Sequence, residues 1–172
     1  NIYNAMAAYL AASLLGIDGR IIASALARYK GMGRRFENAG KVGGIPIISD
    51  YAHHPKEIKA VIDAAREAFG KGVIAAFQPH TYTRTKALME EFAGCFSGAE
   101  AVLLLPVYAA REEYDAEGSS IALYERLSGV HPNAYYLDSF HQASLLIRRM
   151  RGSCVLILGA GDIFKLAAMI AD

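Results

Sequence analysis

Several features are scarce in this sequence of 172 residues, and each scarcity argues against a class of protein. The only cysteines, Cys95 and Cys154, lack CxxC spacing, which indicates neither a disulfide framework nor a cysteine metal site and favours a reducing cytoplasm. No apolar stretch is long enough to cross a membrane, and the first residues lack the basic segment of a secretion signal. The 18 basic and 17 acidic side chains nearly cancel, so no broad charge favours nucleic acid or a membrane surface.

The first 32 residues have the pattern of two short helices followed by a glycine-rich break. Apolar residues recur at helical spacing over residues 5–15, and Asp18 can cap a second helix that runs to about Tyr29. The segment KGMG at residues 30–33 interrupts this pattern and predicts a domain boundary. The chain also begins inside a helical pattern and without an initiator Met. We therefore expect residues 1–32 to be the helical edge of a neighbouring domain, and residues 33–172 to form a domain of their own.

Beyond the break, short apolar runs alternate with helical patterns. The runs lack polar alternation, which is typical of parallel strands covered on both faces, and they lie at residues 45–49, 73–77, 101–105 and 154–158, with a weaker one at 134–137. A helix can begin at Pro55, another can be capped by Ser139, and further apolar stripes at helical spacing span residues 88–96 and 163–170. This alternation predicts a Rossmann-like α/β fold with a doubly wound, mostly parallel sheet.

Nearly all the polar residues that could do chemistry follow the predicted strands. In such a sheet the carboxyl ends of the strands meet at one edge, where ligands bind. Four loops follow the strands, and they comprise Ser49–His54, Gln78–Arg84, Pro106–Glu113 and Gly159–Asp162. We therefore expect a site where these loops meet, although the sequence does not indicate the role of the long loop over residues 106–120.

The segment DYAHHP places one acid and two imidazoles at a strand end. Asp50 can accept hydrogen bonds from ribose hydroxyls, or it can be a turn residue. His53 and His54 are adjacent and cannot point the same way, so we expect one to face the site and the other to pack. A zinc site would need further ligands, and His80 is the only well-placed candidate, so no metal is predicted.

Cationic side chains stand near two other loop positions. Arg84 lies on a segment running into a helix, where its planar fork suits a carboxylate or a phosphate, although a surface arginine is the alternative. The pair Arg34 and Arg35 follows the glycine break and could reach a ligand between domains.

The GAGD segment is glycine-rich but does not match a dinucleotide-binding fingerprint. Phe164 stands where G-x-G-x-x-G requires its third glycine, and the segment follows the last strand instead of the first. A tight turn with Asp162 as the helix N-cap is favoured over phosphate binding. No G-x-x-x-x-G-K-[ST] phosphate loop occurs anywhere in the sequence.

Taken in order, six motifs resemble the Mur ligase family of bacterial cell-wall synthesis. They are N-x-x-N-A-x-A-A, G-x-x-R-R-F-E, D-Y-A-H-H-P-x-E-I, F-Q-P-H-x-Y-x-R-T, V-Y-x-A-R-E and G-A-G-D-I, and together they span essentially the whole chain. The pattern is similar to the branch that adds L-alanine to UDP-N-acetylmuramate. A sister branch, which recycles murein tripeptide onto the same acceptor, shares much of it and is the alternative, but RRFE and FQPHTYTRT favour the alanine branch.

The resemblance implies the C-terminal part of an ATP-dependent carboxylate–amine ligase with three domains, in the bacterial cytoplasm. In that reaction ATP phosphorylates the muramoyl carboxylate, and the amine of L-alanine attacks the acyl phosphate. Mg²⁺ would be held mainly by the central domain, which with the N-terminal domain lies outside this sequence. The fragment alone would then be inactive.

The resemblance also assigns roles to individual residues. Arg35 and His53 would be catalytic. The remaining roles are adenine contact for Asn1 and Asn4, ATP phosphate contact for Arg35, ribose contact for Asp50, and the amino-acid site for Tyr51, His53, His80 and Arg84. Many relatives have Arg at the position after His80, where this sequence has Thr81, so Arg84 would contribute more to carboxylate recognition.

Two hypotheses from other classes make different demands on the sequence. A stand-alone nucleotide-binding module of Rossmann type would have a glycine fingerprint after its first strand, where this chain has DYAHHP. A purely structural docking domain would not need polar groups concentrated at strand ends.

Overall fold

The computed structural model describes residues 2–29 and 33–172, and the chain divides into two compact units, Asn1–Gly33 and Arg34–Asp172. The first unit contains α1 (Ile2–Leu14) and α2 (Gly19–Arg28), which contact each other. Asp18 caps α2 by accepting a hydrogen bond from the amide of Arg20 at 2.8 Å, which confirms the predicted cap. Residues 30–32 of the predicted boundary lie outside the described residues.

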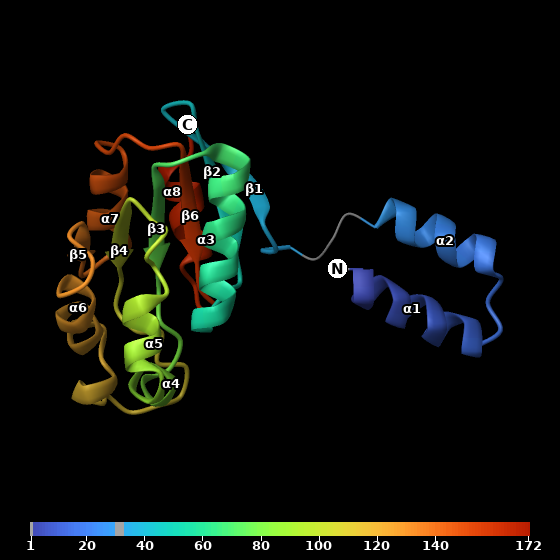
Figure 1. The fold of residues 1–172 in the computed structure, drawn as a ribbon, viewed down its shortest axis with the longest axis horizontal. Helices are drawn as coiled ribbons and strands as arrows, with labels where there is room; N and C mark the ends of the chain where they lie inside the picture. Colours follow the sequence, from blue (N-terminus) through green and yellow to red (C-terminus); the bar gives the residue numbers. More distant parts are fainter. Residues whose placement is uncertain (1, 30–32) are drawn as a thin grey trace. The chain divides into compact units, whose positions relative to one another are not determined.

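The second unit is built on a six-stranded sheet with the order β1-β2-β6-β3-β4-β5 (Figure 1). All neighbouring strands are parallel except β1 and β2, which are antiparallel. The strands are β1 (Glu37–Val42), β2 (Ile45–Asp50), β3 (Val73–Phe77), β4 (Ala101–Leu104), β5 (Ala134–Tyr136) and β6 (Cys154–Leu158). The predicted Rossmann-like, mostly parallel sheet is therefore confirmed.

Helices cover both faces of this sheet (Figure 1). One face packs against α3, α5 and α6, and the other packs against α7 and α8. The helices are α3 (Pro55–Phe69), α4 (Tyr82–Ala87), α5 (Met89–Gly94), α6 (Ser120–Ser128), α7 (Phe140–Ile147) and α8 (Phe164–Ile170), with a 3-10 turn, η1, at Ala116–Gly118. Within the described ranges, no helix has the length and apolar character needed to span a membrane.

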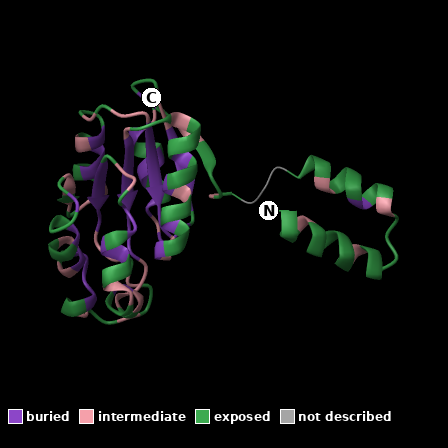
Figure 2. Cartoon of the chain, in the orientation of Figure 1, coloured by how far each residue is buried: buried purple, intermediate pink, exposed green. Residues whose placement is uncertain are grey.

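The central strands explain why the apolar runs show no alternation. All five residues of β3 and all five of β6 are buried (Figure 2). Phe77 packs into the layer with Phe92 and Phe96, whereas Ile74 faces the opposite layer with Ile147. Because both faces are covered, each position favours an apolar side chain, worth about 1.5–3 kcal/mol for a fully buried Phe or Ile.

The sequence prediction missed or misjudged three elements. The edge strand β1 has the polar sequence ENAGKV and is half exposed, so it lacks the apolar run of a buried strand. Helix α6 lies after the long loop and was not predicted. The stripe expected over residues 88–96 is helical only in α5, because Leu88, with φ −119°, separates α5 from the preceding short helix α4.

Candidate functional site

Backbone hydrogen bonds join the four predicted loops along the carboxyl edge of the sheet. The amide of Gly159 donates to the carbonyl of Asp50 at 3.2 Å, and the amide of Gln78 donates to the carbonyl of Leu158 at 3.1 Å. Further along, the amide of Tyr108 donates to the carbonyl of Pro79 at 2.8 Å. The loops that follow β2, β6, β3 and β4 therefore form one continuous rim.

The carboxylate of Asp50 is buried and bonded to two backbone amides. One oxygen accepts from the amide of Ala52 at 2.7 Å, and the other accepts from the amide of Phe36 at 2.7 Å. The side chain is only 6% exposed. Asp50 thus ties the DYAHHP turn to the segment that contains Arg35, and each of its oxygens accepts one backbone hydrogen bond.

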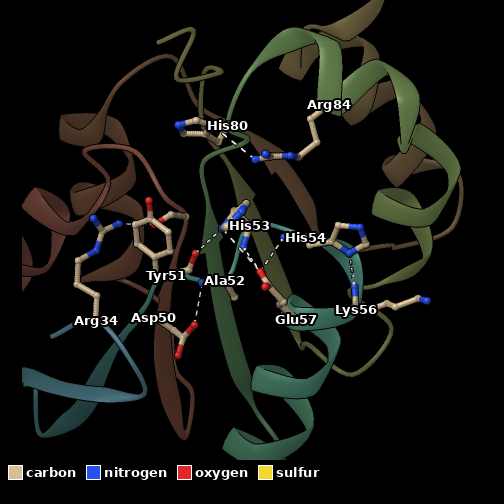
Figure 3. Close-up of polar contacts among 11 residues, drawn as sticks. Arg34, Asp50, Tyr51, Ala52, His53, His54, Lys56, Glu57, His80 and Arg84 are labelled. Carbon is tan, nitrogen blue, oxygen red and sulfur yellow. Dashed lines mark hydrogen bonds and ion pairs between the residues drawn. The ribbon is translucent and has the colours of Figure 1, made fainter. Parts of the chain in front are cut away.

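The two adjacent histidines have different environments (Figure 3). His54 is the N-cap of α3: its ring accepts from the amide of Lys56 at 3.4 Å, and the carboxylate of Glu57 accepts from the amide of His54 at 3.2 Å. His53 faces the other loops, with its ring centroid 6.2 Å from that of His80. His53 is therefore the histidine that lies in the loop cluster.

Glu57 completes this turn from the first turn of α3. Its carboxylate accepts hydrogen bonds from the amides of both histidines and lies 3.7 Å from Nδ1 of His53. Desolvation raises the pKa of Glu57, but these amides and the neighbouring imidazoles outweigh it and hold the pKa below its ordinary value.

Planar side chains form a row across the rim. The guanidinium carbon of Arg34 lies 4.9 Å from the ring centroid of Tyr51, which in turn meets the edge of the His53 ring at 5.3 Å. Past His53 comes His80, whose ring stacks on Tyr108 with centroids 5.5 Å apart. The row crosses the loops after β2, β3 and β4, and it leaves Tyr51 38% exposed at the surface of the cluster.

Arg84 extends from α4 toward the histidines (Figure 3). One guanidinium nitrogen lies 3.5 Å from Nδ1 of His80. Desolvation lowers the pKa of His80, and the positive charge of Arg84 and the electrostatic effect of His53 lower it further, against a smaller opposing effect of Glu112. His80 is therefore neutral at pH 7, and the guanidinium of Arg84 is the positive charge beside it.

The loop of unknown role is fastened to α4. Thr81, the N-cap of α4, has φ 68° and makes no side-chain cap; such a φ is strained for a β-branched residue. Instead the carboxylate of Glu112 accepts from the amide of Thr83 at 2.9 Å, and Lys86 pairs with Asp115 at 3.2 Å. The loop therefore fixes the start of the helix that carries Arg84.

The GAGD segment is a close-packed turn. A Cβ atom on Gly161 would lie 2.5 Å from Oε1 of Gln78 and 2.7 Å from Cβ of Tyr108, so these side chains fill the space that a phosphate would need. The predicted N-cap role of Asp162 is wrong. Its carboxylate accepts from Nε2 of Gln78 at 3.1 Å and contacts Lys165, while α8 begins without a side-chain cap.

The residues predicted to contact ATP are not gathered into one cluster, unlike those predicted to bind the amino acid. Arg35 is exposed on the segment before β1, and Asn4 is exposed on α1 in the other unit. Asn1 lies outside the described residues. The sequence analysis missed Gln78, Tyr108 and Glu112, whose partners stand far away along the chain; their only signal was membership of the strand-end loops.

The described side chains offer no metal site. Within residues 2–29 and 33–172, no group of three or more His, Cys, Asp or Glu side chains could hold an ion. Burial raises the pKa of both Cys95 and Cys154 to about 12, so neither thiol is a ready ligand or nucleophile. The described residues of this chain do not by themselves fit Mg²⁺.

A family model decides the relationship. The model for the glutamate ligase domain of Mur ligases matches residues 34–161, which is most of the chain. The chain belongs to the Mur ligase family. The match begins at Arg34, the first residue of the second compact unit, and ends at Gly161 within the GAGD turn.

Curated Mur ligases match almost the whole chain. A UDP-N-acetylmuramate–L-alanine ligase of Rhizobium etli is 45% identical over 99% of this chain, and one of Caldicellulosiruptor saccharolyticus is 40% identical over 100%. This chain spans only 37% and 38% of those proteins. It therefore corresponds to a little over a third of the length of these relatives.

Solved structures of Mur ligases share the fold. The UDP-N-acetylmuramate–alanine ligase of Thermotoga maritima matches 99% of this chain and 36% of its own, with a TM-score of 0.75 and 27% identity. A murein peptide ligase of Psychrobacter arcticus matches 98% of this chain and 35% of its own, with a TM-score of 0.73 and 21% identity, which supports the fold alone.

Proposed function

We propose that this Mur ligase chain is the C-terminal part of an ATP-dependent ligase that joins L-alanine to UDP-N-acetylmuramate in the bacterial cytoplasm. The observation that supports it most is the pairing of Arg84 with a neutral His80 on the rim, in a chain 45% identical to a protein named for that activity. A guanidinium suits the α-carboxylate of an amino acid, and closely packed rings suit a small side chain.

Each side chain of the cluster has one task in this proposal. Arg84 binds the carboxylate of L-alanine, and Tyr51 and His53 border the small methyl group. Neutral His80 offers Nδ1 as an acceptor to Arg84 and so orients the guanidinium for that carboxylate. The catalytic role of His53 is to orient the amine of L-alanine toward the activated muramoyl carboxylate.

The remaining residues of the proposal bind ATP. Arg35 is exposed and free to turn toward phosphate, and a lone pair of Asp50 would meet the ribose. Asn1 and Asn4 would contact the adenine. ATP supplies the phosphoryl group that activates the carboxylate, and its Mg²⁺ would be held by domains of the longer protein, since the described acidic residues here form no metal group.

The relatives favour the alanine ligase over its alternatives. Among the solved structures, the murein peptide ligase is 21% identical and the L-alanine ligase is 27% identical, and curated ligases named for L-alanine reach 40–45%. A stand-alone dinucleotide module is disfavoured because Gln78 and Tyr108 crowd Gly161.

A matched pair of arginine variants tests the proposal in the full-length protein. Arg84→Ala removes a charge-assisted hydrogen bond of about 1.5–3 kcal/mol, so KM for L-alanine should rise roughly 10- to 150-fold. Arg35→Ala removes the same group from the ATP side and should raise KM for ATP instead. The measurement is phosphate release with Mg²⁺ and UDP-N-acetylmuramate, first with L-alanine varied and then with ATP varied. Equal effects of both variants on the same substrate would show that the two sites are misassigned.

A further inference from the structure

Two adjacent arginines of this chain have opposite environments. Arg35 is exposed, whereas the side chain of Arg34 folds back onto the rim. Its guanidinium carbon lies 4.9 Å from the ring centroids of both Tyr51 and Phe164, and its Nη2 donates to the carbonyl of Gly159. Figure 3 shows the guanidinium beside the Tyr51 ring. Arg34 is therefore clamped between a loop after β2 and the turn after β6.

The backbone around Arg34 is held with equal firmness. Arg34 has φ 60° and Phe36 has φ 48°, values that L residues adopt at a cost. The amide of Arg34 donates to the carboxylate of Glu37 at 2.6 Å, and its carbonyl accepts from the amide of Tyr51 at 2.7 Å. The amide of Phe36 is bound by Asp50. These contacts fix a strained turn, which is typical of a functional segment.

Only a planar cation can make the Arg34 contacts. A guanidinium can stack against rings on both faces while its edge donates hydrogen bonds in the same plane, whereas an ammonium is a point charge without faces. Nε of Arg34 is buried and has no hydrogen-bond partner among the described residues, which is a cost that the stacking and the bond to Gly159 offset. Arginine and lysine at position 34 would therefore carry the same charge and differ in the shape of the cationic group.

We propose that Arg34 is a positioning residue for the amino-acid site. It holds the ring of Tyr51, which packs edge-on against His53, and so sets both side chains for the incoming amino acid. Arg35 is left for the phosphates. This inference rests on the proposed function, because it names the substrate whose binding depends on Arg34.

The test compares charge-conserving variants in the full-length ligase. Arg34→Lys keeps the charge and loses the stacking, and it should raise KM for L-alanine about tenfold, with KM for ATP changed less than about twofold. Arg35→Lys is the matched partner and should affect ATP. Arg149→Lys, an exposed position in the turn after α7, at the opposite edge of the sheet, is the control for unspecific effects.

A second variant covers loss of folding. Phe164 is 45% exposed, so Phe164→Leu should fold, and by removing one stacked ring it should raise KM for L-alanine in the same direction but less. An unchanged KM for L-alanine in both variants, or an effect mainly on ATP, would overturn the role of Arg34. A wild-type protein without L-alanine-dependent phosphate release would instead refute the proposed function.

Discussion

His80 is kept neutral by its surroundings. Burial lowers the pKa of His80, and the nearby charge of Arg84 is the next largest cause. As the pH falls, His80 is therefore protonated in the unfolded chain before it is protonated in the folded protein. The contribution of His80 to stability is therefore complete above its ordinary pKa of 6.5 and is lost as the pH falls through the lower folded value.

We predict that Arg84→Gln raises the pKa of His80 toward its ordinary value. The substitution removes a positive charge whose guanidinium lies 3.5 Å from the ring, while leaving most of the burial in place. An NMR titration of the His80 ring protons would measure the change. Arg149→Gln is the control, because Arg149 lies at the opposite edge of the sheet. An identical titration of His80 in the wild type and in Arg84→Gln would contradict the prediction.

At the scale of elements, the turn between β6 and α8 depends on a glycine with no room for a methyl group. We predict that Gly161→Ala lowers the free energy of unfolding by about 1–3 kcal/mol through overpacking, since its Cβ would lie 2.5 Å from Gln78 Oε1. Denaturant unfolding of the 172-residue chain measures this. Gly94→Ala in α5 is the control: nothing lies within 4 Å of its Cβ, so Ala should be neutral or stabilising. Equal stability of Gly161→Ala and the wild type would refute the steric argument.

The helices of the first unit should open more easily than the central strands. Helix α1 has no buried residue and α2 buries only Ile22, whereas β3 and β6 are buried throughout. Few buried apolar contacts leave little free energy against local opening. Hydrogen exchange of the 172-residue chain should therefore show low protection in α1 and α2. Protection equal to that of β3 would mean that these helices fold cooperatively with the sheet.

For the whole molecule, we predict that the 172-residue chain folds but has no ligase activity. Its sheet is covered on both faces by its own helices, which is sufficient for a stable core. Phosphoryl transfer needs groups that neutralise charge on the γ-phosphate, and the described residues hold no metal group. Calorimetry with ATP and a phosphate-release assay would test both halves. Turnover above background would refute the idea that the catalytic centre is shared between domains.

Much of the architecture could be predicted because burial on two faces leaves a local signal. The runs at β3 and β6 are apolar throughout. Asp18 and Ser139 each cap a helix by accepting from an amide two or three residues away, and Pro55 is the first residue of its helix. The edge strand β1 escaped prediction because its partner supplies its stability. One face of β1 is exposed to solvent, so the side chains on that face need not be apolar.

By itself the sequence determined the fold class, the family resemblance and the four loops at the sheet edge, since each depends on residue type and spacing along the chain. Only the tertiary structure decided which histidine joins the cluster and that Arg34 is clamped while Arg35 is exposed. Arg34 meets Gly159, 125 positions away, and Glu112 meets Thr83 across a loop. Such contacts depend on where parallel strands bring distant loops together. Two adjacent residues of the same type, such as Arg34 and Arg35, give no signal in the sequence for which side chain will be packed and which will be exposed.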